Sequence, residues 1–143
     1  MTPPTRLLDS LSRAALGWVF IQAGTDVVRA PEPPAKKAAP VLAAVRSVVP
    51  VPLPDDVTVV RLNAAVQVVA GAALTIGVAP RVAAAVLIGS IVPTTAGGHR
   101  FWEFEPGLER TGQRIHFTKN LSIVGGLLHL LITPRRPHRK DNA

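Results

Sequence analysis

The chain contains no cysteine, no tyrosine and few charged residues. Without cysteine it can form no disulfide, no redox-active Cys-x-x-Cys pair, no thiolate metal ligand and no cysteine nucleophile. Only 17% of the 143 residues are charged, against the roughly 25% typical of soluble domains. The length is that of a single domain over residues 1–143. The composition therefore excludes thiol chemistry by this chain and disfavours an ordinary soluble fold.

Three long stretches carry no charge at all. They cover residues 62–80, 82–98 and 120–134. Each approaches the roughly 17–25 residues that cross a bilayer as a helix. The second stretch, VAAAVLIGSIVPTTAGG, lacks the polar face that a soluble surface helix needs. A fourth apolar segment at 11–28 is interrupted by Arg13 and Asp26. The pattern therefore predicts helices that span a membrane.

The predicted fold is all-α, a membrane-embedded four-helix bundle with a proline-rich first outer loop and a polar, aromatic second outer loop. The spans are expected at 7–28, 58–78, 82–96 and 116–133, followed by a basic tail at 134–143. No cleavage site of the signal-peptide type follows the first apolar run, so this segment is expected to remain as a membrane helix. The dense basic tail favours cytoplasmic termini.

The first predicted outer loop, residues 29–57, holds half of the 14 prolines. Within it, APVLAAVRSVV at 39–49 has apolar residues at helical spacing. Two interpretations remain open, a short amphipathic helix on the membrane surface and an extended proline-rich linker. Asp55 or Asp56 is expected to cap the next helix. Pro80 suits the first position of the third span after a tight turn.

A polar or small face runs along the second predicted span. Asn63, Gln67, Gly71 and Thr75 recur every four residues. Embedded polar groups normally face other helices or a cavity, because facing lipid is costly. This face can join helices by close approach and hydrogen bonds, or it can line a cleft for a ligand headgroup.

The cleft interpretation gives the charged residues of the first two spans a role. Asp26 near the end of the first span needs a partner in such a cleft, and Arg61 or Arg29 is the expected one. The net charge of +7 does not indicate nucleic acid, since the basic residues sit at the ends of apolar spans. Anionic lipid headgroups explain that placement better.

A polar stretch, GHRFWEFEPGLERTGQRIHFTKN, separates the third and fourth predicted spans at 98–120. Trp102 and its phenylalanine neighbours suit a membrane interface. Gln113, His116 and Asn120 have the spacing that places side chains on one helical face. Glu103 is expected to pair with Lys119 or Arg114. The stretch can therefore be a set of interface anchors or a binding site.

As a binding site, this stretch suits a polar headgroup such as a quinone carbonyl flanked by aromatic rings. A metal or haem site on His99 and His116 fits no specific signature, so neither cofactor is expected. The complete candidate cleft consists of Asp26, Arg61, Asn63, Gln67, His99, Trp102, Glu103, Gln113, His116, Lys119 and Asn120.

Four segments resemble the DoxX family of small four-helix membrane proteins, in its actinobacterial form. They are LGWVFIQAGTDVVRAP, VRLNAAVQVVAG, GVAPRVAAAVLIGSIVPTTAGGHRFWE and QRIHFTKNLSIVGGLL. The resemblance runs from about Arg6 to Thr133, and its most specific parts are Phe101-Trp102-Glu103 and His116-Phe117-x-Lys119-Asn120. Ala64 departs from the glycine expected after Asn63, which alters helix packing slightly.

The resemblance implies a plasma-membrane four-helix bundle linked to quinone-dependent sulfur oxidation or to an oxidative-stress complex with soluble enzymes. It supplies no agreed catalytic residues, and no self-contained catalytic site is visible, so an enzyme is not expected. Three functions follow. The first is a non-catalytic membrane partner of a redox complex, and the second is a quinone-binding subunit. The third is a small-solute transporter, which needs a homo-oligomer because one chain has too few helices.

Overall fold

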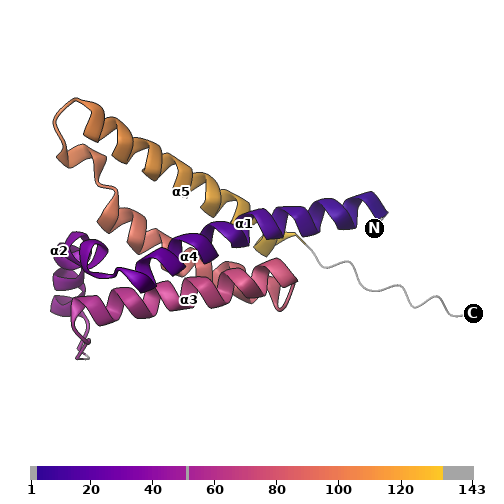
Figure 1. The fold of residues 1–143 in the computed structure, drawn as a ribbon, viewed down its shortest axis with the longest axis horizontal. Helices are drawn as coiled ribbons and strands as arrows, with labels where there is room; N and C mark the ends of the chain where they lie inside the picture. The colour runs from indigo at the N-terminus through magenta and orange to yellow at the C-terminus, as the bar shows by residue number, and fades with distance from the viewer. Residues whose placement is uncertain (1–2, 51, 134–143) are drawn as a thin grey trace, which may run out of the picture.

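The computed structural model describes residues 3–50 and 52–133. Within them the chain is all-helical, as predicted, and has no strand. The elements are α1 (Pro3–Arg29), α2 (Glu32–Val48), α3 (Asp56–Ile76), α4 (Pro80–Gly98), the 3-10 helix η1 (Phe101–Glu103) and α5 (Leu108–Ile132). Figure 1 shows α1 and α3 running along each other, α2 across one end, and α5 inclined to the others. The predicted basic tail lies outside the described residues.

Three of the described helical segments are long and apolar enough to cross a membrane. They are Asp56–Ile76, Pro80–Glu103 and Leu108–Ile132. The 27-residue α1 is long enough but is not among them, since charged residues near both ends leave only 14–25 uncharged. The second and third predicted spans are thus matched by α3 and α4. The last begins earlier than expected, at Leu108 instead of His116, because the polar residues of 108–115 continue the same helix.

Asp55 is the N-cap residue of α3. It is one of the two predicted candidates, Asp55 and Asp56. Its carboxylate accepts from the backbone N–H of Thr58 at 3.0 Å and from the Thr58 hydroxyl at 2.7 Å. These bonds hold the pKa of Asp55 below its usual value, because they favour the ionised form. The helix ends at Gly77, whose φ of 79° is a left-handed conformation that favours glycine. Pro80 then opens α4, as predicted.

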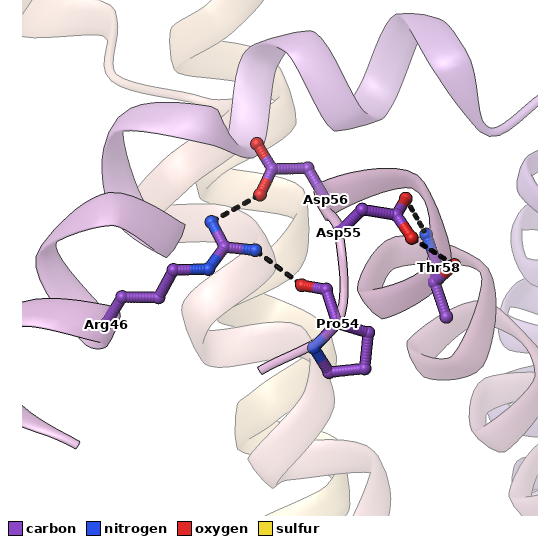
Figure 2. A network of polar contacts seen from close by, with 5 residues as sticks. All are labelled: Arg46, Pro54, Asp55, Asp56 and Thr58. Atoms are coloured by element: carbon purple, nitrogen blue, oxygen red, sulfur yellow. Dashed lines mark hydrogen bonds and ion pairs between the residues drawn. The ribbon is translucent and has the colours of Figure 1, made fainter. Parts of the chain in front are cut away.

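The segment with two open interpretations is helical. As α2 it is longer than the predicted 39–49 and includes the prolines at its start. Arg46 near its end binds the Asp56 carboxylate and the Pro54 carbonyl, each at 2.6 Å (Figure 2). Val41 lies against Gly97 of α4, where an added Cβ would be 3.1 Å from the valine Cγ2. The helix is therefore fixed over the start of α3 and the end of α4.

The buried core is shared by α1, α3, α4 and α5. It contains Phe20, Ala70, Leu74, Ala83, Ala84, Leu87, Ile91, Ile123 and Leu127. Many large apolar side chains lie outside it and are exposed, among them Val69, Val82 and Leu121. An apolar exterior around a small core is expected of helices that face lipid, because the bilayer replaces water as the surrounding solvent.

The closest helix contact joins α1 to α3 through glycine. A Cβ on Gly17 would lie 2.5 Å from the Gly71 carbonyl oxygen and would collide with the Thr75 hydroxyl. One on Gly24 would lie 2.7 Å from the carbonyl oxygen of Ala64. The absence of side chains lets the two backbones approach, as at other membrane-helix interfaces. Buried Ala64 is accommodated because Gly24 faces it.

Candidate functional site

A hydrogen-bond chain joins α3 to α4 and runs from buried Gln67 to exposed Thr94. The Gln67 amide donates to the Ser90 hydroxyl at 2.8 Å, and Ser90 donates to the Asn63 carbonyl oxygen at 2.8 Å. The Asn63 amide donates to Thr94 at 3.3 Å. Gln67 and Ser90 are both buried. Asn63 and Gln67, two of the predicted cleft residues, thus bond to the neighbouring helix.

Sequence reasoning missed Ser90 as a member of this chain. The available signal was its place as the single polar residue between Pro80 and Val92 other than Arg81 at the helix start. The other half of the four-residue face has a different neighbour, since Gly71 and Thr75 pack against Gly17 of α1. The face therefore joins α3 to two helices and does not line one continuous cleft.

Asp26 and Arg61 do not come together. Both side chains are exposed, and none of the ion pairs among the described residues includes Asp26. The expected pair with Arg61 or Arg29 does not form, and for Arg61 the reason is geometric. Gly24 faces α3, and a residue two positions further along a helix lies about 200° around the axis. Asp26 therefore points away from α3.

A second polar group forms where α4 ends against α5. The His99 and His116 rings stack with centroids 5.0 Å apart and an interplanar angle of 16°. His99 Nδ1 is 2.9 Å from Gln113 Oε1. One turn further along α5, Asn120 donates to the Thr95 hydroxyl at 2.9 Å. The three polar residues predicted to share one helical face thus all meet the end of α4.

Thr94 and Thr95 place the two polar groups on different sides of α4. Thr94 contacts Asn63 of α3, whereas its neighbour contacts Asn120 of α5. Each threonine hydroxyl also donates to a backbone carbonyl four residues earlier, at 2.8 Å for Thr94 and 2.7 Å for Thr95. The polar groups are therefore held by the helix itself as well as by its neighbours.

Three aromatic rings gather beside the histidine pair. Phe101 makes edge contacts with Trp102 at 5.2 Å and with Phe117 at 5.5 Å, and Trp102 and Phe117 are 6.0 Å apart. Trp102 remains 54% exposed. Phe117 follows His116 directly in α5, so the aromatic cluster adjoins the polar group.

Glu103 pairs with neither predicted partner. Its carboxylate binds Arg100 at 2.8 Å, three residues earlier in the same short turn. This local partner is close by chain geometry, whereas Lys119 and Arg114 are on another helix. Lys119 is exposed and belongs to none of the ion pairs among the described residues. The prediction of a Glu103–Lys119 pair was therefore wrong.

The site thus consists of two parts. The interior part is a set of hydrogen bonds between helices, and the part at the α4–α5 end combines two histidines, an amide and aromatic rings. Within residues 3–50 and 52–133, no three His, Asp or Glu side chains gather as they would around a metal ion.

These features define an all-helical membrane protein with polar groups between its spans. The DoxX family model matches residues 8–100, more than half of the chain. The chain belongs to the DoxX family. The match includes most of α1 and all of α2 to α4, and it stops before η1 and α5. The likeness of Phe101-Trp102-Glu103 and of His116-Phe117-x-Lys119-Asn120 to the family therefore rests on the sequence resemblance alone. No curated protein sequence and no solved structure matches the chain.

Proposed function

We propose that this protein is a four-span plasma-membrane protein that acts as a non-catalytic partner of a redox or oxidative-stress complex. The observation that supports this role is that the polar groups between α3 and α4 bond to one another. Asn63, Gln67, Ser90 and Thr94 bond to one another, and such bonds hold helices together in lipid. Groups occupied in this way serve the assembly of the membrane domain.

The shared core supports a fourth span, α1. Phe20 of α1 is buried with Leu74, Leu87 and Leu127 of the other three helices. Asp9 and Arg13 pair near the N-terminal end of α1, which lowers the cost of placing both near a bilayer. Long basic side chains at a helix end can also extend to the headgroups. With four spans, both ends of the chain share one side, which we assign to the cytoplasm.

The test is affinity purification of the tagged protein in mild detergent, with mass spectrometry of the proteins and lipids that accompany it. The control is an unrelated multi-pass membrane protein carrying the same tag and expressed at the same level. We expect soluble redox or thiol-handling enzymes to be enriched over this control, and reciprocal purification of those enzymes to recover the chain. Absence of any enriched enzyme in both directions would contradict the proposed role.

A quinone-binding subunit is the second candidate, favoured by the group at the α4–α5 end. The ring N–H of His116 can donate to a quinone carbonyl, because that of His99 is bonded to Gln113 Oε1. The exposed ring of Trp102 can flank a planar headgroup. The purified protein would then contain extractable quinone, reduced in His116→Ala and Trp102→Ala but unchanged in His129→Ala, a histidine at the other end of α5. A protein free of quinone in native lipid excludes this candidate, and a haem absorption band would contradict both.

A further inference from the structure

Positive charge gathers around His116 from two helices and a connecting segment. Lys119 lies three residues after His116 on α5, so the two side chains share a face. His99 stacks on the His116 ring. Lys119 and Lys37 both lie close enough to act electrostatically on this imidazole. The neighbourhood therefore has an excess of positive charge.

The position of Lys37 follows from the packing of α2. Val41 lies against Gly97, two residues before His99, and Lys37 is one helical turn before Val41 on the same face of α2. Lys37 thus lies on the α2 face that turns toward the end of α4. Its neighbour Lys36 is also exposed, but it is rotated about 100° around the helix and so lies off this face.

The acidic residues nearest to this group in sequence are Glu32, Glu105 and Glu109, and they take part in none of the ion pairs among the described residues. Two acidic residues further away are already paired. Glu103 is bound to Arg100, and Asp56 is bound to Arg46 at the other end of α2. Lys37 and Lys119 are both exposed, and neither takes part in the ion pairs of the described residues. Two lysines beside a histidine pair are thus available to an anion from outside the chain.

Apolar surface adjoins the basic group along α5. Ile115 is 61% exposed and lies one helical turn before Lys119 on the same face of α5. The aromatic cluster of Phe101, Trp102 and Phe117 lies on the same part of the molecule. A ligand that suits both features has an anionic head and apolar chains, which is the chemistry of an anionic phospholipid.

We infer that Lys37, His116 and Lys119 form a binding site for the phosphate of an anionic phospholipid, whose acyl chains lie on the exposed face of α5. A neutral quinone carbonyl needs a hydrogen-bond donor but gains little from two lysines, so the charge balance favours an anion. The inference rests on the proposal that α5 spans the membrane. It does not depend on a redox partner.

The test uses the fluorescence of Trp102 in a Trp18→Phe background, where Trp102 is the only tryptophan left. The full-length protein is reconstituted in unbrominated phosphatidylcholine vesicles. One series receives increasing amounts of phosphatidylglycerol with brominated acyl chains, and a parallel series receives phosphatidylcholine with brominated acyl chains. Bromine quenches nearby tryptophan, so the two quenching curves give the relative affinity of the site for the anionic lipid. We expect the brominated phosphatidylglycerol to quench at a clearly lower mole fraction.

Matched variants locate the site. Lys37→Gln and Lys119→Gln should each weaken the relative affinity for phosphatidylglycerol about fivefold, the effect of one basic residue at an anionic surface. Lys37→Arg should retain the preference, and Lys36→Gln should change it by less than about twofold. Circular dichroism and size-exclusion profiles confirm that each variant is folded, which is expected because these lysines are exposed.

Three results would overturn the inference. Equal quenching by the two brominated lipids removes the preference for an anion. Equal losses of relative affinity for phosphatidylglycerol in Lys36→Gln and Lys37→Gln would mean that the lipid is attracted by surface charge in general and not by a specific site. Relief of the phosphatidylglycerol quenching by inorganic phosphate at constant ionic strength assigns the site to a free anion instead of a lipid. Because the vesicles contain no partner protein, these outcomes are independent of the purification that tests the proposed function.

Discussion

The side-chain amide of Gln67 donates a 2.8 Å hydrogen bond to the hydroxyl of Ser90, which joins α3 to α4 inside the protein. Ser90 passes the interaction on to Asn63. Both side chains are buried, so removing Ser90 would leave the Gln67 amide without this partner, whereas removing Gln67 would leave Ser90 bonded to Asn63 alone. The bond is therefore a specific cross-link between two spans and determines how they align.

A double-mutant cycle on this bond should measure a modest coupling. Gln67→Leu and Ser90→Ala are each expected to lower the free energy of unfolding, and their coupling should be about 0.6 kcal/mol and no more than about 1.7 kcal/mol, the range for hydrogen bonds between membrane helices. The measurement is reversible unfolding in mixed detergent micelles. Strict additivity of the two changes would mean that the bond is absent in the folded protein.

Gly17→Ala should destabilise the contact between α1 and α3. The new methyl group meets the Gly71 carbonyl oxygen at 2.5 Å, and moving a backbone to relieve such overpacking costs about 1–3 kcal/mol. Gly89→Ala is the matched control, because an added Cβ there has no neighbour within 4 Å. The control should be neutral or slightly stabilising, since alanine suits a helix better than glycine. Equal thermal stability of both variants would show that α1 does not pack on α3.

Charge neutralisation at Glu103 should couple to Arg100 and not to Lys119. The Arg100–Glu103 pair is partly exposed, so a double-mutant cycle with Arg100→Gln and Glu103→Gln should give about 0.2–1 kcal/mol. The cycle of Lys119→Gln with Glu103→Gln should give no coupling within error. Coupling of Glu103 to Lys119 and not to Arg100 would contradict the local ion pair and would mean that η1 packs against α5 in another way.

The carboxylate of Asp55 should make the stability of the α3 start depend on pH. Its pKa is lowered in the folded state by the bonds from Thr58, so its stabilising effect is present above the unfolded pKa of about 3.9. The effect is lost as the pH falls through the lower folded pKa. Asp55→Ala should therefore lower Tm at neutral pH, and the gap to the parent should narrow below about pH 3.

Asp55→Asn provides the control for that measurement. Asparagine keeps an acceptor for the Thr58 N–H but carries no charge, and it is a good N-cap residue. Its Tm difference from Asp55→Ala should stay nearly constant over the same pH range. A gap between the parent and Asp55→Ala that does not change with pH would mean that the charge of Asp55 contributes nothing.

Local sequence signals were sufficient for the helix boundaries that depend on neighbouring residues. The cap at Asp55 and the start at Pro80 follow from chemistry within one turn, and both are as predicted. Charge-free length likewise predicted α3 and α4 as candidate spans. The start of α5 was missed because charged residues were assigned to a loop, although a helix end outside the bilayer tolerates them.

Partners across helices were beyond what spacing could predict. The face of Asn63, Gln67, Gly71 and Thr75 was visible in the sequence, but its division between two neighbours depends on which helices flank α3. The stack of His99 on His116 also requires the turn at η1 to return the chain to α5. Glu103 illustrates the opposite error, because a partner three residues away was overlooked in favour of distant ones.

The central claim is a four-span membrane protein in which α1 also crosses the bilayer. The natural absence of cysteine allows a direct test with single cysteines placed at Ser10, Ser47, Val78 and Gly107 and labelled by a membrane-impermeant maleimide in intact cells. The four-span topology predicts that Ser47→Cys and Gly107→Cys react from outside, whereas Ser10→Cys and Val78→Cys react only after the membrane is permeabilised. Labelling of Ser10→Cys together with Ser47→Cys on the same side would contradict the claim, because α1 would then lie on one side of the membrane.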